Sequence, residues 1–185
     1  MDTMRLAAIT IDPTGAVSET PILKLGDFAK DGVLKQFVPA RRLASFTIRE
    51  DLAFPIQYQA VFVLAEKDPG GGLSTQLNKF AQQGNKAALA KAKSLGAASL
   101  EAALKAAVAG GGTVEGWAAS VAKEVLQVEA TKWFKDDVFP PSLQSLRVTR
   151  KGFTWSDGRI ESAKKTVIFR GNQGKYHVVY SWKLI

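Results

Sequence analysis

The chain of 185 residues contains no cysteine and a single histidine, His177. Without cysteine it forms no disulfide, no thiolate metal site and no cysteine nucleophile. A His-rich zinc site is excluded as well, and a Ser–His–Asp triad would depend on His177 alone. Because His177 falls between Lys175 and Ser181 on the polar side of a predicted strand, we interpret it as an ordinary surface residue. The sequence predicts no metal and no cofactor.

Long hydrophobic runs are also absent. The longest uncharged stretch is Leu52–Ala65, 14 residues interrupted by Pro55, whereas a helix that crosses a bilayer needs about 20 apolar residues. The segment before Asp12 lacks the apolar centre of a secretory signal peptide. We therefore expect a soluble chain that is cytoplasmic as synthesised, or exported by a route without a classical signal peptide.

Nucleotide-binding loops are not found, although glycine is clustered in two triplets. Neither triplet is followed by the Gly-Lys-Ser/Thr of a P-loop, and neither has the G-x-G-x-x-G spacing of a dinucleotide site. We interpret both as loops that border a helical segment. They are hinge candidates if that segment moves; the six residues are Gly70, Gly71, Gly72, Gly110, Gly111 and Gly112.

Acidic residues are scarce at the C-terminus. The whole chain has 25 Lys and Arg against 17 Asp and Glu, a net charge of +8, yet residues 142–185 hold nine cations and two acids. Such a section is a candidate surface for an anionic partner. The residues that we predict to bind it are Arg147, Arg150, Lys151, Lys164, Lys165, Arg170, Lys175 and Lys183.

The spacing in the last strand argues against sequence-specific nucleic acid recognition by this basic section. Tyr176, Tyr180 and Trp182 fall on one side of the strand, and Lys175 and Lys183 fall on the other. Base stacking needs aromatic rings and cations on one surface. We expect the aromatic side to pack in a core and the lysine side to face solvent.

Strands are predicted in the N-terminal section. Met4–Ile11 is followed by the turn signal Asp-Pro-Thr-Gly at 12–15, in which proline and glycine both favour a reversal. Pro55–Glu66 alternates with a period of two and becomes apolar on both sides toward its end. Two further stretches are also predicted as strands, Thr20–Leu25 and Leu43–Glu50.

The period changes to that of a helix from Leu73 onward. Leu73, Leu77 and Phe80 form one stripe of a short helix, and Lys86–Leu95 and Ser99–Ala109 are rich in alanine, leucine and lysine, which favour helices. Thr113–Lys135 is predicted as the longest helix. Ser99 and Thr113 are the expected N-caps.

Strands are predicted again after Pro140 and Pro141. Ser142–Arg150 leads to a turn at Ser156–Gly158, and Thr166–Arg170 and Lys175–Ile185 flank a hairpin loop of four residues at Gly171–Gly174. Parallel α/β folds alternate strands with helices, and this order does not. The sequence therefore predicts an α+β domain over residues 1–185, an antiparallel sheet or sandwich built from N- and C-terminal strands with a central helical insertion at about 73–136.

Three functions fit these patterns. The first is a non-enzymatic interaction protein that uses its basic section to bind a protein partner, an assembly or an anionic surface such as a membrane or polyanion; a homo-oligomer is compatible with it. The second is a membrane-active protein, pore-forming or lipid-binding, whose helical insertion is released at the glycine triplets. The third is a hydrolase that uses paired carboxylates such as Asp136 and Asp137. We prefer the first, because the constellations needed for catalysis are missing.

Overall fold

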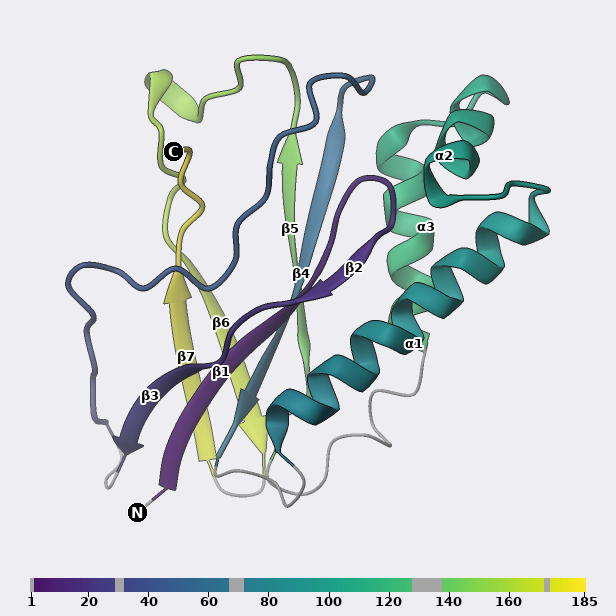
Figure 1. Ribbon diagram of the computed structural model, residues 1–185. Helices are drawn as coiled ribbons and strands as arrows, with labels where there is room; N and C mark the ends of the chain where they lie inside the picture. The colour runs from purple at the N-terminus through teal and green to yellow at the C-terminus, as the bar shows by residue number, and fades with distance from the viewer. Residues whose placement is uncertain (1, 29–31, 67–71, 128–137, 172–173) are drawn as a thin grey trace.

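The computed structural model describes residues 2–28, 32–66, 72–127, 138–171 and 174–185. Its elements follow the order strands, helices, strands (Figure 1). They are β1 (Asp2–Ile11), β2 (Val17–Glu19), β3 (Leu23–Phe28), β4 (Ile56–Ala65), α1 (Leu73–Ser94), α2 (Leu100–Ala109), α3 (Val114–Gln127), β5 (Ser142–Val148), the 3₁₀ turn η1 (Ser156–Gly158), β6 (Lys165–Gly171) and β7 (Gly174–Tyr180).

The main sheet is antiparallel and is built around β1 and β4. Strand β1 pairs with β4 on one side, and on the other side with β2 near its end and β3 near its start. Strand β4 pairs with β5, so the N-terminal and C-terminal sections share one sheet. Strands β6 and β7 form a separate two-stranded sheet. The predicted α+β class with a central helical segment is confirmed.

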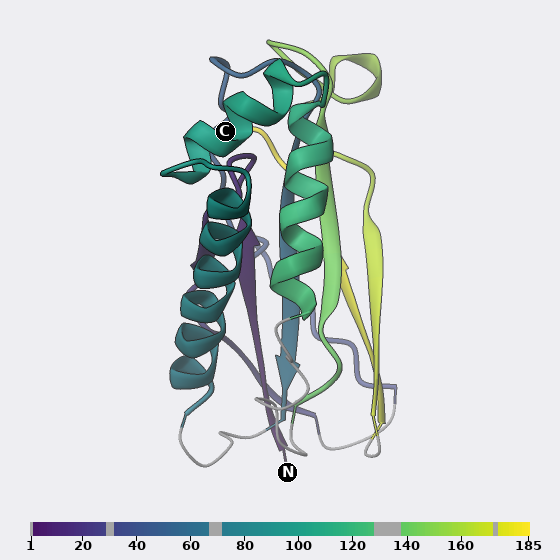
Figure 2. The ribbon, with the colours of Figure 1, turned by 90° about the vertical axis from the view of Figure 1, so that its right-hand side faces the viewer.

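Three layers result from this arrangement (Figure 2). Helices α1 and α3 lie on one side of the main sheet, and the β6–β7 hairpin lies on the other. Alternate residues of β1 supply the two cores: Ala7 and Ile9 belong to the core with the helices, and Leu6 and Ala8 to the core with the hairpin. Strand β4 is buried on both faces from Tyr58 onward, as its apolar end predicts.

The helical layer is joined to the sheet by specific polar contacts as well as by packing. The side-chain amide of Asn85 bonds both the N–H and the carbonyl of Val17, at 2.9 and 2.7 Å. Gly84, one residue earlier in α1, lies against Val17 and Val125, where an added Cβ would come within 3.0 Å of the Val125 side chain. The missing side chain therefore lets α1 approach both β2 and α3.

Several local predictions are confirmed. The turn after β1 is closed by Asp12, whose Oδ1 accepts hydrogen bonds from the N–H groups of Thr14, Gly15 and Ala16. Ser99 and Thr113 cap α2 and α3, because their side-chain hydroxyl oxygens accept hydrogen bonds from the N–H groups of Ala102 and Gly116. Such caps satisfy N–H groups that have no partner inside the helix.

Five predicted elements differ from the structure. Leu73–Phe80 and Lys86–Leu95 are parts of one helix, α1, which has 22 residues and is longer than the described part of α3. Thr20–Leu25 is replaced by β2 and β3 on either side of Pro21. Leu43–Glu50 forms no strand. The hairpin strands extend to Gly171 and from Gly174, which are register partners, so the predicted four-residue loop is too long.

Candidate anion-binding surface

The outer face of the β6–β7 hairpin is exposed to solvent. Along each strand the side chains alternate: Val167 and Phe169 point into the core and are 4% and 1% exposed, while their neighbours point outward. We call the outward set the outer hairpin face; it consists of Thr166, Ile168 and Arg170 on β6 and Lys175, His177 and Val179 on β7, with Lys164 and Lys183 continuing the alternation beyond the strand ends.

Like charges lie opposite each other on this face. Arg170 and Lys175 are direct register partners across the two strands. Such a pair is destabilising, since cross-strand neighbours of the same sign repel. Within the described ranges no ion pair neutralises either residue, nor Lys164 or Lys183. Glu161 is the β-bridge partner of Lys183 and accepts a hydrogen bond from the Ser181 hydroxyl, so an acid lies beside Lys183 at the end of the hairpin away from Arg170 and Lys175.

The other four predicted cations lie elsewhere. The Arg147 Nε atom lies 2.9 Å from Glu115 of α3, on the helix side of the main sheet. Lys151 is paired with Glu50 at 2.9 Å, and this hydrogen bond raises the pKa of its ammonium group. Arg150 is exposed beside Lys151, and Lys165 is exposed opposite Tyr180 at the start of β6. Of the eight, the structure thus places Arg170 opposite Lys175 at the turn end of the hairpin, and Lys164 and Lys183 at its other end.

The hairpin is fixed to the main sheet by its aromatic inner face. Tyr176 donates its hydroxyl hydrogen to Glu66 of the segment after β4 at 3.0 Å, and Tyr180 donates to Gln144 of β5 at 2.7 Å. The Tyr180 ring meets Phe62 edge to face, with centroids 5.0 Å apart. Burial raises the pKa of Tyr180. The outer hairpin face is therefore held in one orientation by side chains of the inner face.

Sequence reasoning missed a second exposed region, the segment Gly32–Arg42 before β4. Leu34 and Val38 are 86% and 82% exposed. Two cations are held against rings in this region: Lys35 lies over Phe28 at 4.7 Å and Arg41 over Phe37 at 4.2 Å. The available signal was the mixture of Val, Leu and Phe with Lys and Arg in a stretch that has neither the period of a helix nor that of a strand.

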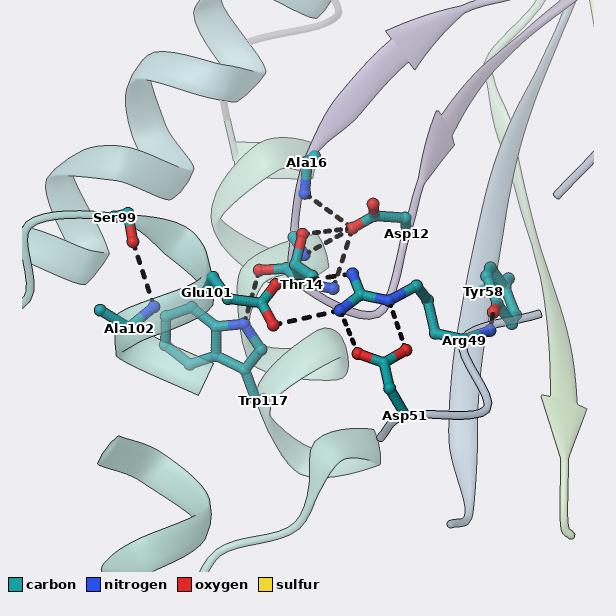
Figure 3. Close-up of polar contacts among 11 residues, drawn as sticks. Asp12, Thr14, Ala16, Arg49, Asp51, Tyr58, Ser99, Glu101, Ala102 and Trp117 are labelled. Carbon is teal, nitrogen blue, oxygen red and sulfur yellow. Dashed lines mark hydrogen bonds and ion pairs between the residues drawn. The ribbon is translucent and has the colours of Figure 1, made fainter. Parts of the chain in front are cut away.

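An ion-pair cluster is centred on Arg49 (Figure 3). Its guanidinium contacts Asp51 at 2.6 Å and Glu101 of α2 at 3.1 Å, and these hydrogen bonds raise the pKa of Arg49. The bond from Arg49 lowers the pKa of Asp51 to about 2. The backbone N–H of Arg49 donates to the Tyr58 hydroxyl, which in turn donates to the carbonyl of Thr47. The cluster ties the chain before β4 to α2.

Two concavities border the main sheet. One of about 580 Å³ lies between the β1–β2 hairpin and the extended segment before β4; it is lined by several hydroxyl side chains together with Asp12, Arg42, Arg49 and Tyr58. The other, of about 380 Å³, lies between α3 and strands β4 and β5. It contains the buried side chain of Gln59, whose Oε1 atom has no hydrogen-bond donor within the described part of the chain.

The remaining predicted residues are placed as follows. Gly72 precedes α1 with φ +78, Gly110 is the C-cap of α2 and Gly111 has φ +91; Gly70, Gly71 and the pair Asp136–Asp137 lie outside the described residues. Release of the helical layer stays a prediction, which the contacts of Asn85 with Val17 oppose. His177 is exposed on the outer hairpin face, opposite Ile168.

Searches of the described ranges for two further features gave no candidate. No cluster of three or more His, Asp or Glu side chains there is arranged to hold a metal ion. None of the helices in those ranges combines the length and apolarity needed to cross a bilayer. Comparison of the chain with protein-family models, curated proteins and solved structures gives no match.

Proposed function

We propose that this chain is a non-enzymatic binding protein that recognises an anionic partner with the outer hairpin face. The observation that carries the proposal is the register of Arg170 opposite Lys175 on a rigidly held face. A like-charge pair weakens the hairpin on its own account. An anionic partner would turn that repulsion into two favourable contacts.

Ion pairs elsewhere in the structure give a partial contrast. Lys91 is paired with Glu124 at 3.2 Å and Arg147 with Glu115 at 2.9 Å, whereas Lys86 and Lys93 of α1 have no carboxylate partner in the part of the chain that the structure describes. The cations of the outer hairpin face have none in the described residues. A cation field without internal neutralisation raises the local concentration of anionic ligands and speeds their association.

The test is the retention of the full chain on immobilised heparin, a sulfated polyanion, against rising NaCl concentration. Lys164 and Lys175 are replaced together by glutamate, and reversal at Lys175 also gives Arg170 an opposite charge across the ladder. Each cation close to an anionic surface contributes about 1 kcal/mol, so losing two should weaken binding by about 30-fold. Reversing the signs should cost still more.

The matched control is the double replacement Lys86→Glu with Lys93→Glu. Both lysines are exposed on α1, on the opposite side of the main sheet, and the change in net charge is identical. We expect this variant to lose much less heparin affinity than the hairpin variant. Equal losses in the two variants would mean that only net charge matters, and the assignment to the hairpin would be wrong.

A further inference from the structure

The segment Gly32–Arg42 lies next to β7 of the binding hairpin. The ring of Phe28, just before the segment, meets Tyr176 at the start of β7 with centroids 6.0 Å apart. The ring of Phe46, just after it, meets Trp182 beyond the end of β7 at 6.1 Å. Figure 1 shows the segment standing away from the main sheet beside β7. Residues on either side of the described segment therefore lie near the two ends of β7.

Several apolar side chains on this segment are largely exposed to solvent. Val33, Leu34 and Val38 are 43%, 86% and 82% exposed. The outer hairpin face also exposes Ile168 at 45% and Val179 at 58%. Scattered exposed apolar residues are common, but Val33, Leu34 and Val38 lie within six residues of one segment, Gly32–Arg42, which also carries three cations and no acid.

The cations beside these apolar side chains are oriented by contacts at the base of the segment. Lys35 is held over Phe28, and the Arg41 Nη1 atom donates a hydrogen bond of 2.6 Å to the carbonyl of Lys24 while its guanidinium covers Phe37. Cation–π contacts of this kind contribute about 0.5–1 kcal/mol at exposed sites. Phe28 and Phe37 are thus each covered on one face by a cation, whereas Leu34 and Val38 are 86% and 82% exposed.

We propose that the segment Gly32–Arg42 is a membrane-docking loop, and that the anionic partner of the outer hairpin face is a bilayer surface rich in acidic phospholipid. This inference rests on the proposed function and names its ligand. Leu34 and Val38 enter the boundary between headgroups and acyl chains. Lys35, Arg41 and Arg42 on the loop, with the cations of the outer hairpin face, contact the headgroup charge.

The mixture of side chains distinguishes a bilayer from a protein partner. The buried centre of a protein interface is depleted in charged residues, lysine in particular. Here Lys35 lies between Leu34 and Val38 in the sequence and Arg41 and Arg42 follow them, and basic residues beside exposed apolar ones are typical of surfaces that insert shallowly into anionic membranes. A bilayer also supplies uniform negative charge above an apolar layer, so it matches both halves of this surface without a shaped pocket.

The absence of cysteine from the 185 residues makes a direct test possible. Leu34→Cys is labelled with an environment-sensitive fluorophore and titrated with vesicles of neutral phosphatidylcholine, or of phosphatidylcholine with phosphatidylserine. Leu95→Cys is the control, because Leu95 is 54% exposed at the end of α1 in the helical layer. We expect a blue shift at position 34 with the anionic vesicles and no shift at position 95.

A second variant separates lipid insertion from charge. Leu34→Ser with Val38→Ser leaves every charge in place, and both residues are exposed, so folding should be unaffected, which a thermal melt checks. Burial of the Leu34 and Val38 side chains in the bilayer drives binding, so the variant should bind anionic vesicles at least about tenfold more weakly than the wild type. Its retention on heparin, which has no apolar layer, should equal that of the wild type.

The outcomes assign each failure to one proposal. The membrane-docking loop would be overturned if position 34 shows no shift, or if the serine variant binds vesicles as tightly as the wild type. If heparin binding still depends on Lys164 and Lys175, the proposed anionic-partner site on the hairpin would stand. Absent or charge-independent heparin binding would overturn the proposed function itself. Equal insertion into neutral and anionic vesicles would overturn the requirement for acidic lipid.

Discussion

The indole N–H of Trp117 donates a hydrogen bond of 2.7 Å to the carbonyl of Thr14, 103 residues earlier in the chain. The bond is buried, and it joins α3 to the turn between β1 and β2. The Asp12 carboxylate closes the same turn from within. The turn is therefore held from two sides, by its own first residue and by the helical layer.

Replacing Trp117 by Phe should destabilise the protein by about 1–3 kcal/mol. The Thr14 carbonyl would lose its donor in a buried position, and an unsatisfied buried polar group carries a cost of that size. Urea unfolding monitored by circular dichroism measures the change. The control is Trp155→Phe, since the Trp155 ring packs on Phe153 without a hydrogen bond from its indole nitrogen in the described residues. Equal destabilisation in both variants would contradict this role for the bond.

Much of the fold could be predicted because local signals agree with the tertiary contacts. The Asp-Pro-Thr-Gly turn, the N-caps Ser99 and Thr113 and the two-sided burial of β4 each follow from residues adjacent in sequence. The prediction of two helices in place of α1 is wrong because Gly84 and Asn85, between them, resemble the end of a helix. In the structure their roles are tertiary: Gly84 admits Val17 and Val125, and Asn85 bonds Val17.

The prediction of a strand at Leu43–Glu50 is wrong for a different reason. Its alternating pattern is suited to β structure, but the edges of β1 are already taken by β2, β3 and β4. The segment is instead held by the Tyr58 hydroxyl, through Thr47 and Arg49. No local pattern reveals whether a sheet edge is free.

Part of the candidate surface could be proposed from the sequence. The excess of cations singled out Lys164, Arg170, Lys175 and Lys183, and alternation along the last strand gave the side of Lys175 and Lys183. That excess also included Arg147 and Lys151, whose carboxylate partners Glu115 and Glu50 come from distant parts of the chain. The loop around Leu34 and Val38 has no period, so its exposure could be read only from the structure.

Tyr58→Phe should destabilise the protein by about 1–3 kcal/mol, because the hydroxyl serves the Thr47 carbonyl and the Arg49 N–H together. Burial also raises the pKa of Tyr58 above its ordinary value. A group with a raised pKa in the folded state contributes stability below its unfolded pKa of about 10 and loses it as the pH rises further. Urea unfolding between about pH 9 and 11 should show a smaller alkaline loss in the variant. An unchanged slope would assign that loss to other groups with a raised pKa, Tyr180 and Lys151.

The Asp51 carboxyl should titrate with a pKa of about 2, because Arg49 donates a hydrogen bond to its charged form. Arg49→Gln should return the pKa toward the ordinary value of about 4. The pKa is lower in the folded state, so the stabilisation is complete above about pH 4 and is lost as the pH falls toward 2. Carboxyl carbon shifts in an NMR titration measure both values. A pKa near 4 in the wild type would contradict the ion pair.

Gly171→Ala should loosen the hairpin from the main sheet. An added Cβ would lie 2.8 Å from Cε1 of the Phe139 ring, and Phe139 is fixed by the bond from its N–H to the Leu64 carbonyl. Overpacking of this kind costs about 1–3 kcal/mol. Thermal unfolding measures it, with Thr166→Ala on the exposed outer hairpin face as the control, for which we expect a change within about 0.5 kcal/mol. A neutral Gly171→Ala would show that Phe139 can move.

Arg170→Glu should change stability and binding in opposite directions. It converts the like-charge pair with Lys175 into an opposite pair in direct register, which should stabilise the hairpin by about 0.2–1 kcal/mol. At the same time it removes a cation from the binding face, so the NaCl concentration that elutes the protein from heparin should fall. Lys86→Glu makes the same charge change on α1 and should leave elution nearly unchanged. A variant that binds heparin as well as the wild type would show that Arg170 is unpaired for some reason other than an anionic ligand. A lower melting temperature would show that the pair with Lys175 does not repel in the folded protein.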